Sequence, residues 1–177
     1  MKTHKMVLAA LFVALTAIGA FIKIPLGLTY ITLQFFFTAM AGILLGAKWG
    51  AASQGVYVLL GLMGIPIFTQ GGGPAYVLTP TCGFLFGLIL SAFVIGKITE
   101  GGQSAGRIAA ACLAGLGVLY AVGLPYMYLI LNLYLDRALS FAYVAKAGML
   151  VYLPGDFLKI AAAVVLSRKL IPILRKQ

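Results

Sequence analysis

Acidic side chains are almost absent from this sequence. Its 177 residues include three of them, Glu100, Asp136 and Asp156, and 9% of all residues are charged against 63% that are hydrophobic. A soluble domain of this size usually carries about a quarter charged residues. So many apolar residues cannot all face the interior of a small protein, so lipid must solvate much of the surface. The composition therefore predicts an all-α integral membrane protein.

Reactive side chains are scarce as well. The chain has one histidine, His4, and two cysteines, Cys82 and Cys112, both in apolar surroundings. These residues provide no serine–histidine–acid set, no metal cluster and no spaced cysteine framework. The glycine run at 71–73 lacks the Gly-Lys-Ser/Thr of a phosphate-binding loop. We therefore expect no catalytic residue, no metal site and no cofactor.

Six apolar segments come close to the roughly 20 residues that a membrane-spanning helix needs. They are residues 6–22, 35–47, 50–65, 80–98, 107–130 and 150–170. The first has no convincing cleavage site and is expected to be retained. Pro125 should kink or break the fifth. The pattern predicts one domain, residues 1–177, folded as a six-transmembrane-helix bundle with structured outer loops.

Basic residues divide unequally between the two sides that these spans define. On the side of the N-terminus are Lys2, Lys5, Lys48, Lys97, Arg107, Arg168, Lys169, Arg175 and Lys176; on the other are Lys23, Arg137 and Lys146. Cytoplasmic loops carry an excess of lysine and arginine, so both termini are expected to be cytoplasmic. The net charge of +10 fits this topology better than a nucleic-acid-binding face.

One of the carboxylates lies inside an apolar segment. Asp156 and Lys159, in "LPGDFLK", are three residues apart and share one helix face. A charged group at the bilayer centre costs about 2.5–3.5 kcal/mol on insertion scales, and such groups usually serve function. Pro154 and Gly155 fit a helix start whose dipole favours a carboxylate in the first turn. The pair is either self-neutralising near the interface or, as we favour, a binding pair facing the bundle interior.

Two irregular segments are expected above the outer end of that last helix. Residues 23–34, "KIPLGLTYITLQ", and residues 65–83, "IPIFTQGGGPAYVLTPTCG", are apolar and contain proline and glycine. Non-helical backbone near membrane depth needs protein or a water-lined cavity to satisfy its polar groups. In the first helix, Ala10 and Ala14 are spaced so that another helix can approach closely, either inside the bundle or in a partner.

Four stretches of the sequence together form a recognisable pattern: "IP…ITLQ" (24–34), "LLGAKWGAASQGVYVLLGLMGIPIF" (44–68), "GGGPAYVLTPTCGFLFG" (71–87) and "LPGDFLK" (153–159). In this order they resemble the BioY family, the biotin-specific substrate-binding (S) components of energy-coupling-factor (ECF) transporters. The chain departs from the family pattern at Thr79 and at "CGF" (82–84), which stand where the family usually has glycines of "GPTGGY". The acid–lysine pair of the last helix is intact.

The resemblance implies a cell-membrane protein of a bacterium or archaeon that captures biotin at its outer face. It would dock through Ala10 and Ala14 onto a transmembrane coupling protein that carries two ABC-type ATPases. Asp156 would accept the ureido N–H groups of biotin, and Lys159 would meet the ureido carbonyl or, less favoured, the tail carboxylate. The expected binding residues are Asp156, Lys159, Gln34, Thr32, Gly73, Tyr76, Thr81, Phe84 and Tyr152. The alternatives are an S component for another vitamin or, from another class, a small membrane enzyme or channel.

Overall fold

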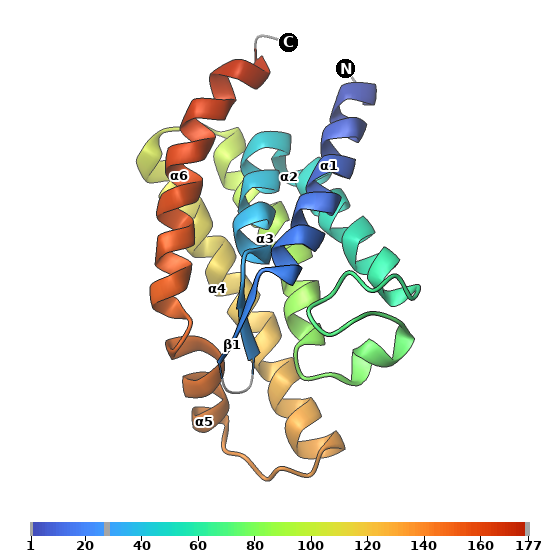
Figure 1. Ribbon diagram of the computed structural model, residues 1–177. Coiled ribbons are helices and arrows are strands. Elements are labelled where there is room, and N and C mark those ends of the chain that lie inside the picture. Colours follow the sequence, from blue (N-terminus) through green and yellow to red (C-terminus); the bar gives the residue numbers. More distant parts are fainter. Residues whose placement is uncertain (1, 27–28, 176–177) are drawn as a thin grey trace.

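The computed structural model describes residues 2–26 and 29–175, and helices dominate it (Figure 1). The long helices are α1 (Lys2–Phe21), α2 (Gln34–Leu62), α3 (Cys82–Glu100), α4 (Ala105–Leu129) and α6 (Leu153–Arg175). The short ones are η1 (Pro74–Leu78), η2 (Ile130–Tyr134), α5 (Phe141–Ala145) and η3 (Lys146–Leu150). Strands β1 (Lys23–Leu26) and β2 (Thr29–Thr32) form an antiparallel hairpin, which the sequence pattern did not predict.

Helix α2 consists of two antiparallel halves that meet at Gly46. The backbone there has φ 82° and ψ 176°, which interrupts the helix and turns the chain back on itself. Gln34 and Thr38 of the first half hydrogen-bond to Tyr57 and Gln54 of the second, each over 2.9 Å. A straight helix would hold these side chains several turns apart. The predicted interruption between segments 35–47 and 50–65 is therefore confirmed.

Within the described part of the chain, four helices are long and apolar enough to cross a membrane. They are α1, α2, α3 and α4 extended through η2; the pair 141–150 and 153–173, bent by 41°, makes a fifth candidate. The count of six spans treats the two halves of α2 separately, and it stays a prediction. Helix α4 continues through Pro125, so a break at this proline is wrong. The missing N–H removes only one hydrogen bond from the helix.

Both ends of the described chain lie at the same end of the bundle, opposite β1 and α5 (Figure 1). The reversal of α2 and the α3–α4 connection lie at the end of the bundle where the termini are, and they carry Lys48, Lys97 and Arg107. Lys23 and Lys146 belong to β1 and η3 at the opposite end. Lys176, also counted with the first group, lies outside the described residues. The fold thus separates the basic residues as the sequence predicts.

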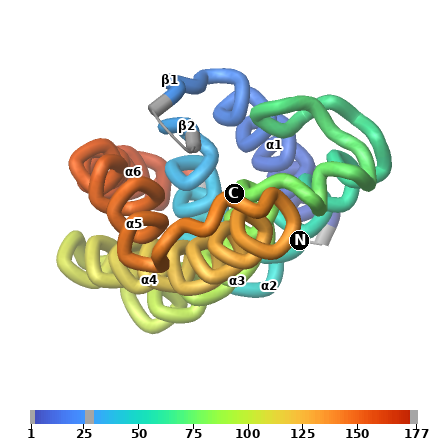
Figure 2. Tube along the Cα trace, turned by 90° about the horizontal axis from the view of Figure 1, so that it is seen from below, coloured from blue at the N-terminus to red at the C-terminus, as the bar shows by residue number. Residues whose placement is uncertain are grey.

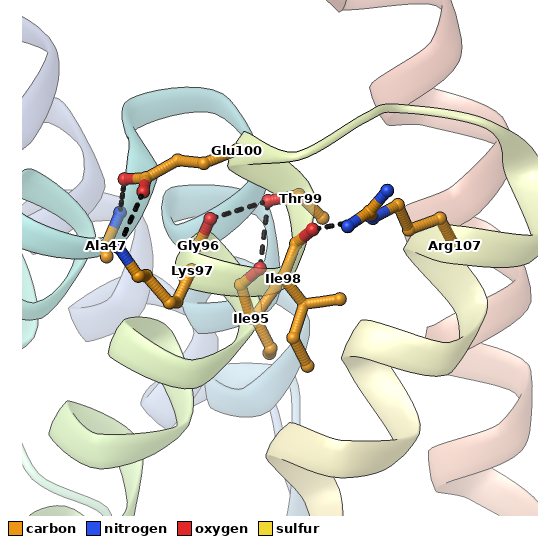
Figure 3. A network of polar contacts seen from close by, with 8 residues as sticks. All are labelled: Ala47, Ile95, Gly96, Lys97, Ile98, Thr99, Glu100 and Arg107. Carbon is orange, nitrogen blue, oxygen red and sulfur yellow. Dashed lines mark hydrogen bonds and ion pairs between the residues drawn. The ribbon is translucent and has the colours of Figure 1, made fainter.

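Polar side chains connect the helices at the end of the bundle where the termini lie (Figure 3). Glu100 Oε1 accepts the backbone N–H of Ala47, where the second half of α2 begins, over 3.0 Å. The other oxygen of Glu100 lies 3.7 Å from Lys97 Nζ. Arg107 Nε donates to the carbonyl of Ile98 over 2.8 Å, near the end of α3. A carboxylate at one helix start and a cation at a helix end both complement the helix dipoles.

A buried amide joins α1 to both halves of α2. Gln54 is fully buried, and its Nε2 donates to Thr16 Oγ1 and Ser53 Oγ, each over 3.2 Å. Its Oε1 accepts from Thr38 Oγ1 over 2.9 Å. The amide therefore meets side chains of three helical segments in the buried interior, where a polar group needs a partner within the protein. Such interhelical hydrogen bonds stabilise membrane helices by about 1–2 kcal/mol at most, and they fix the relative rotation of the helices.

Candidate substrate-binding site

A cavity lies between the β1–β2 hairpin and the neighbouring ends of α2, α3, α4 and α6. When the bundle is seen from its hairpin end, the hairpin lies between α1 and α6 (Figure 2). The cavity encloses about 670 Å³ of space when its open mouth is included. Its wall is mainly apolar, with Phe35, Leu85, Leu88 and Leu119 among its lining residues. An apolar wall with a few polar groups is typical of small-molecule sites.

A buried ion pair forms part of the wall of the cavity. Lys159 Nζ lies 2.6 Å from Asp156 Oδ1, and the two side chains are 11% and 5% exposed. The hydroxyl of Tyr120 donates to the other carboxylate oxygen, Oδ2. Asp156 lies in the first turn of α6, as predicted. An ionised carboxylate has about four acceptor sites, so Asp156 retains capacity to accept from a ligand.

The ring of Tyr120 is itself held in place by Phe84, since the two rings pack edge to face with centroids 6.2 Å apart. Both side chains line the cavity. Tyr120 therefore orients Asp156 from α4, while Lys159 orients it from its own helix. The pair faces a cavity inside the bundle, which fits the binding interpretation better than a self-neutralising pair at the interface.

The loop after α2 places two further polar side chains in the wall. Phe68 is buried between Tyr57 and Tyr76, with ring centroids 5.5 Å and 4.6 Å away. Next to it, Thr69 Oγ1 lies 3.0 Å from Tyr76 Oη, and both residues line the cavity. Gln34 Nε2 donates to the hydroxyl of Tyr57 over 2.9 Å. The loop is thus anchored on buried aromatic rings, which hold its polar groups toward the cavity.

Gly73 is not part of the described cavity lining. Its φ of 106° is a left-handed conformation that favours glycine, and its N–H donates to the carbonyl of Gly61 over 2.7 Å. The residue forms a turn in the loop that borders the cavity, and its contact with a ligand stays a prediction. The other expected binding residues do line the cavity: Asp156, Lys159, Gln34, Thr32, Tyr76, Thr81, Phe84 and Tyr152.

Several lining residues were missed by the sequence reasoning. They are Tyr30, Phe35, Thr69, Leu85, Leu88, Leu119, Tyr120 and Gly148. Signals existed for three of them: Tyr30 and Thr69 lie in the two irregular segments 23–34 and 65–83, and the hydroxyl of Tyr120, in the middle of an apolar span, needs a hydrogen-bond partner. The described residues contain no group of three histidine, cysteine or acidic side chains that could hold a metal.

Ala10 and Ala14 lie on an exposed face of α1, away from the cavity lining. Val7 and Leu11, on the same stretch, are 64% and 51% exposed. In the most apolar part of α1, 28% of the residues are buried, against 56% in α2 and in α3. The alternative in which the two alanines pack inside the bundle does not hold, since their surface faces outward.

A multi-pass helical bundle with a polar pair in an apolar cavity defines a membrane-embedded binding protein for a small molecule. The model of the BioY family matches residues 1–176. The chain therefore belongs to the BioY family.

Two relatives and one solved structure are similar over nearly their whole length. The probable biotin transporter BioY of Lysinibacillus sphaericus is 43% identical over 98% of this chain and 90% of the relative. The biotin transporter BioY of Thermotoga maritima is 39% identical over 94% and 95%. The crystal structure of the S-component for biotin from an ECF-type ABC transporter has a TM-score of 0.83 and 28% identity, covering 99% of this chain and 93% of that one.

Proposed function

We propose that this protein captures biotin and serves as the S component of an ECF-type vitamin transporter. The observation that carries the proposal is the Asp156–Lys159 pair, braced by Tyr120, in the wall of the cavity. The ureido head of biotin offers two N–H donors and one carbonyl acceptor, which match a carboxylate and an ammonium group. The apolar wall suits the thioether ring and the aliphatic chain. The similar proteins named above are biotin transporters and a biotin S-component.

Energy for transport has to come from other subunits. The sequence has no phosphate-binding loop, and the family is one of transport proteins rather than enzymes. We infer that a transmembrane coupling protein and two ABC-type ATPases of an ECF module supply the energy. The exposed face of α1 with Ala10 and Ala14 supports a docking surface for the coupling protein, because small residues let helices approach closely.

Mass spectrometry of the purified protein tests the ligand directly. We expect intact biotin to co-purify with it, and added biotin to give saturable heat in isothermal titration. Another vitamin in place of biotin would assign the protein to a different S component of the same architecture. A protein that carries no small molecule and gives no heat with biotin would contradict the proposal.

The orientation in the membrane is a further part of the proposal. Both termini and the α3–α4 connection are placed in the cytoplasm, on the positive-inside pattern. Two exposed serines suit a labelling test. Ser104 is the N-cap of α4 and accepts from the N–H of Arg107, and Ser140 is the N-cap of α5 and accepts from the N–H of Tyr143. A cysteine at Ser140 should react with an impermeant thiol reagent added to intact cells, and a cysteine at Ser104 should not.

The labelling is done in a chain whose Cys82 and Cys112, both buried, are replaced by alanine. Each serine-to-cysteine variant serves as the control for the other, because both change an exposed N-cap in the same way. Ready labelling at Ser104 together with protection at Ser140 would reverse the orientation and place the cavity on the cytoplasmic side.

A further inference from the structure

Lys23, the first residue of β1, stands at the rim of the cavity. Its Nζ donates to the carbonyl oxygen of Thr69 and lies 5.5 Å from the centroid of the Tyr30 ring. Thr69 and Tyr30 both line the cavity, while Lys23 is exposed. Lys23 is also paired in register with Thr32, another lining residue. Residues directly opposite in an antiparallel pair share a face, so Lys23 lies on the face of the hairpin that borders the cavity.

The ammonium of Lys23 has a charge that its neighbours do not balance. The ion pairs among the described residues are Lys97–Glu100 and Lys159–Asp156. The partners of Lys23 are a neutral carbonyl and an aromatic face. An ammonium carries three N–H donors, and Thr69 uses one of them. The rim therefore offers a cation with free donors to whatever occupies the mouth of the cavity.

The cavity is polar at two places that differ in depth. Asp156 is 4% exposed, whereas Lys23 is exposed at the rim. Apolar side chains such as Phe35, Leu85 and Leu119 supply the wall. A ligand that uses both places has a neutral polar head, an apolar middle and an anionic tail.

We propose that Lys23 binds the tail carboxylate of the ligand, which enters the cavity with its head first. The inference rests on the proposed function, since biotin has a ureido head, an aliphatic chain and a terminal carboxylate. It also assigns the two lysines: Lys159 serves the head beside Asp156, and Lys23 serves the tail. A charge-assisted bond to a carboxylate is about twice as strong as a neutral one, so Lys23 selects the anionic form of the tail.

The test compares biotin with biotinamide, whose neutral amide replaces the tail carboxylate and leaves the head unchanged. Isothermal titration is done on the unmodified protein, on Lys23→Gln and on Lys146→Gln. Lys146 is a matched control, because it is an exposed lysine of η3 outside the cavity lining. We expect Lys23→Gln to weaken biotin binding about tenfold and to leave biotinamide binding unchanged. The unmodified protein should bind biotin about tenfold more tightly than biotinamide.

Three results would overturn the inference. Equal losses for biotin and biotinamide in Lys23→Gln would show that Lys23 only ties the hairpin to Thr69. Unchanged biotin binding in Lys23→Gln would remove Lys23 from recognition altogether. A loss of the same size in Lys146→Gln would assign the effect to the charge of the whole outer surface. A failure of the unmodified protein to bind biotin is a separate result, which contradicts the proposed function and takes the inference with it.

Discussion

Replacing Asp156 by asparagine is expected to lower the affinity for biotin by about ten- to a hundred-fold. The amide keeps the size of the side chain but loses the negative charge that accepts from the ligand. It also leaves Lys159 without its ion-pair partner at 2.6 Å. Hydrogen bonds to charged groups contribute about 1.5–3 kcal/mol each, and about 1.4 kcal/mol is a factor of ten in the dissociation constant. Isothermal titration of the detergent-purified variant measures the change.

Asp136→Asn is the matched control for this substitution. Asp136 is exposed, lies outside the cavity lining and has a φ of 47°, a left-handed conformation that asparagine also tolerates. The Asp136→Asn variant should bind biotin with unchanged affinity. Tyr120→Phe is a milder companion that removes only the hydroxyl donor to Asp156, and it should give a smaller loss. Full affinity in Asp156→Asn would reduce the pair to a structural role in the bundle.

Ala14→Trp is expected to abolish biotin uptake by cells without changing biotin binding by the isolated protein. Ala14 lies on the exposed face of α1, where a bulky ring would hold a partner helix away. It is not part of the cavity lining, so the site should be left intact. Co-purification with the coupling protein measures assembly, and titration with biotin measures the site.

Ala110→Trp provides the control for this second substitution. Ala110 is an exposed alanine on α4, so the change in side-chain size on an exposed helix face is the same. We expect it to assemble and to support uptake. If Ala14→Trp instead loses biotin binding while assembly persists, the partner surface lies elsewhere. Equal loss of assembly in both variants would show that any exposed tryptophan disturbs the bundle.

The helical class and the polar part of the site could be predicted from the sequence for a simple reason. Charged groups are expensive in hydrocarbon, so Asp156 and Lys159 stand out in an apolar segment. The irregular backbone of residues 23–34 and 65–83 stands out in the same way. Together these signals predict most of the polar residues that line the cavity.

The apolar half of the site could not be predicted in this way. Leu85, Leu88 and Leu119 lie in helices that are apolar on every side, so no polar face indicates which residues point inward. The β1–β2 hairpin was missed because its strands are only four residues long each. Its pairing puts Lys23 opposite Thr32, and such a register depends on contacts with the rest of the fold. Tertiary structure alone brings these residues together.

The reversal at Gly46 has a consequence for the thickness of the protein inside the bilayer. The first half of α2, residues 34–45, reaches about 18 Å at about 1.5 Å per residue, well short of the roughly 30 Å of hydrocarbon. Its far end lies at Gln34, which lines the cavity. The leaflet at the hairpin end of the bundle is therefore bordered there by the hairpin and by the cavity in place of further helical turns. A ligand in the cavity completes this wall, so the lipids surround a more continuous apolar body when the protein is loaded than when it is empty.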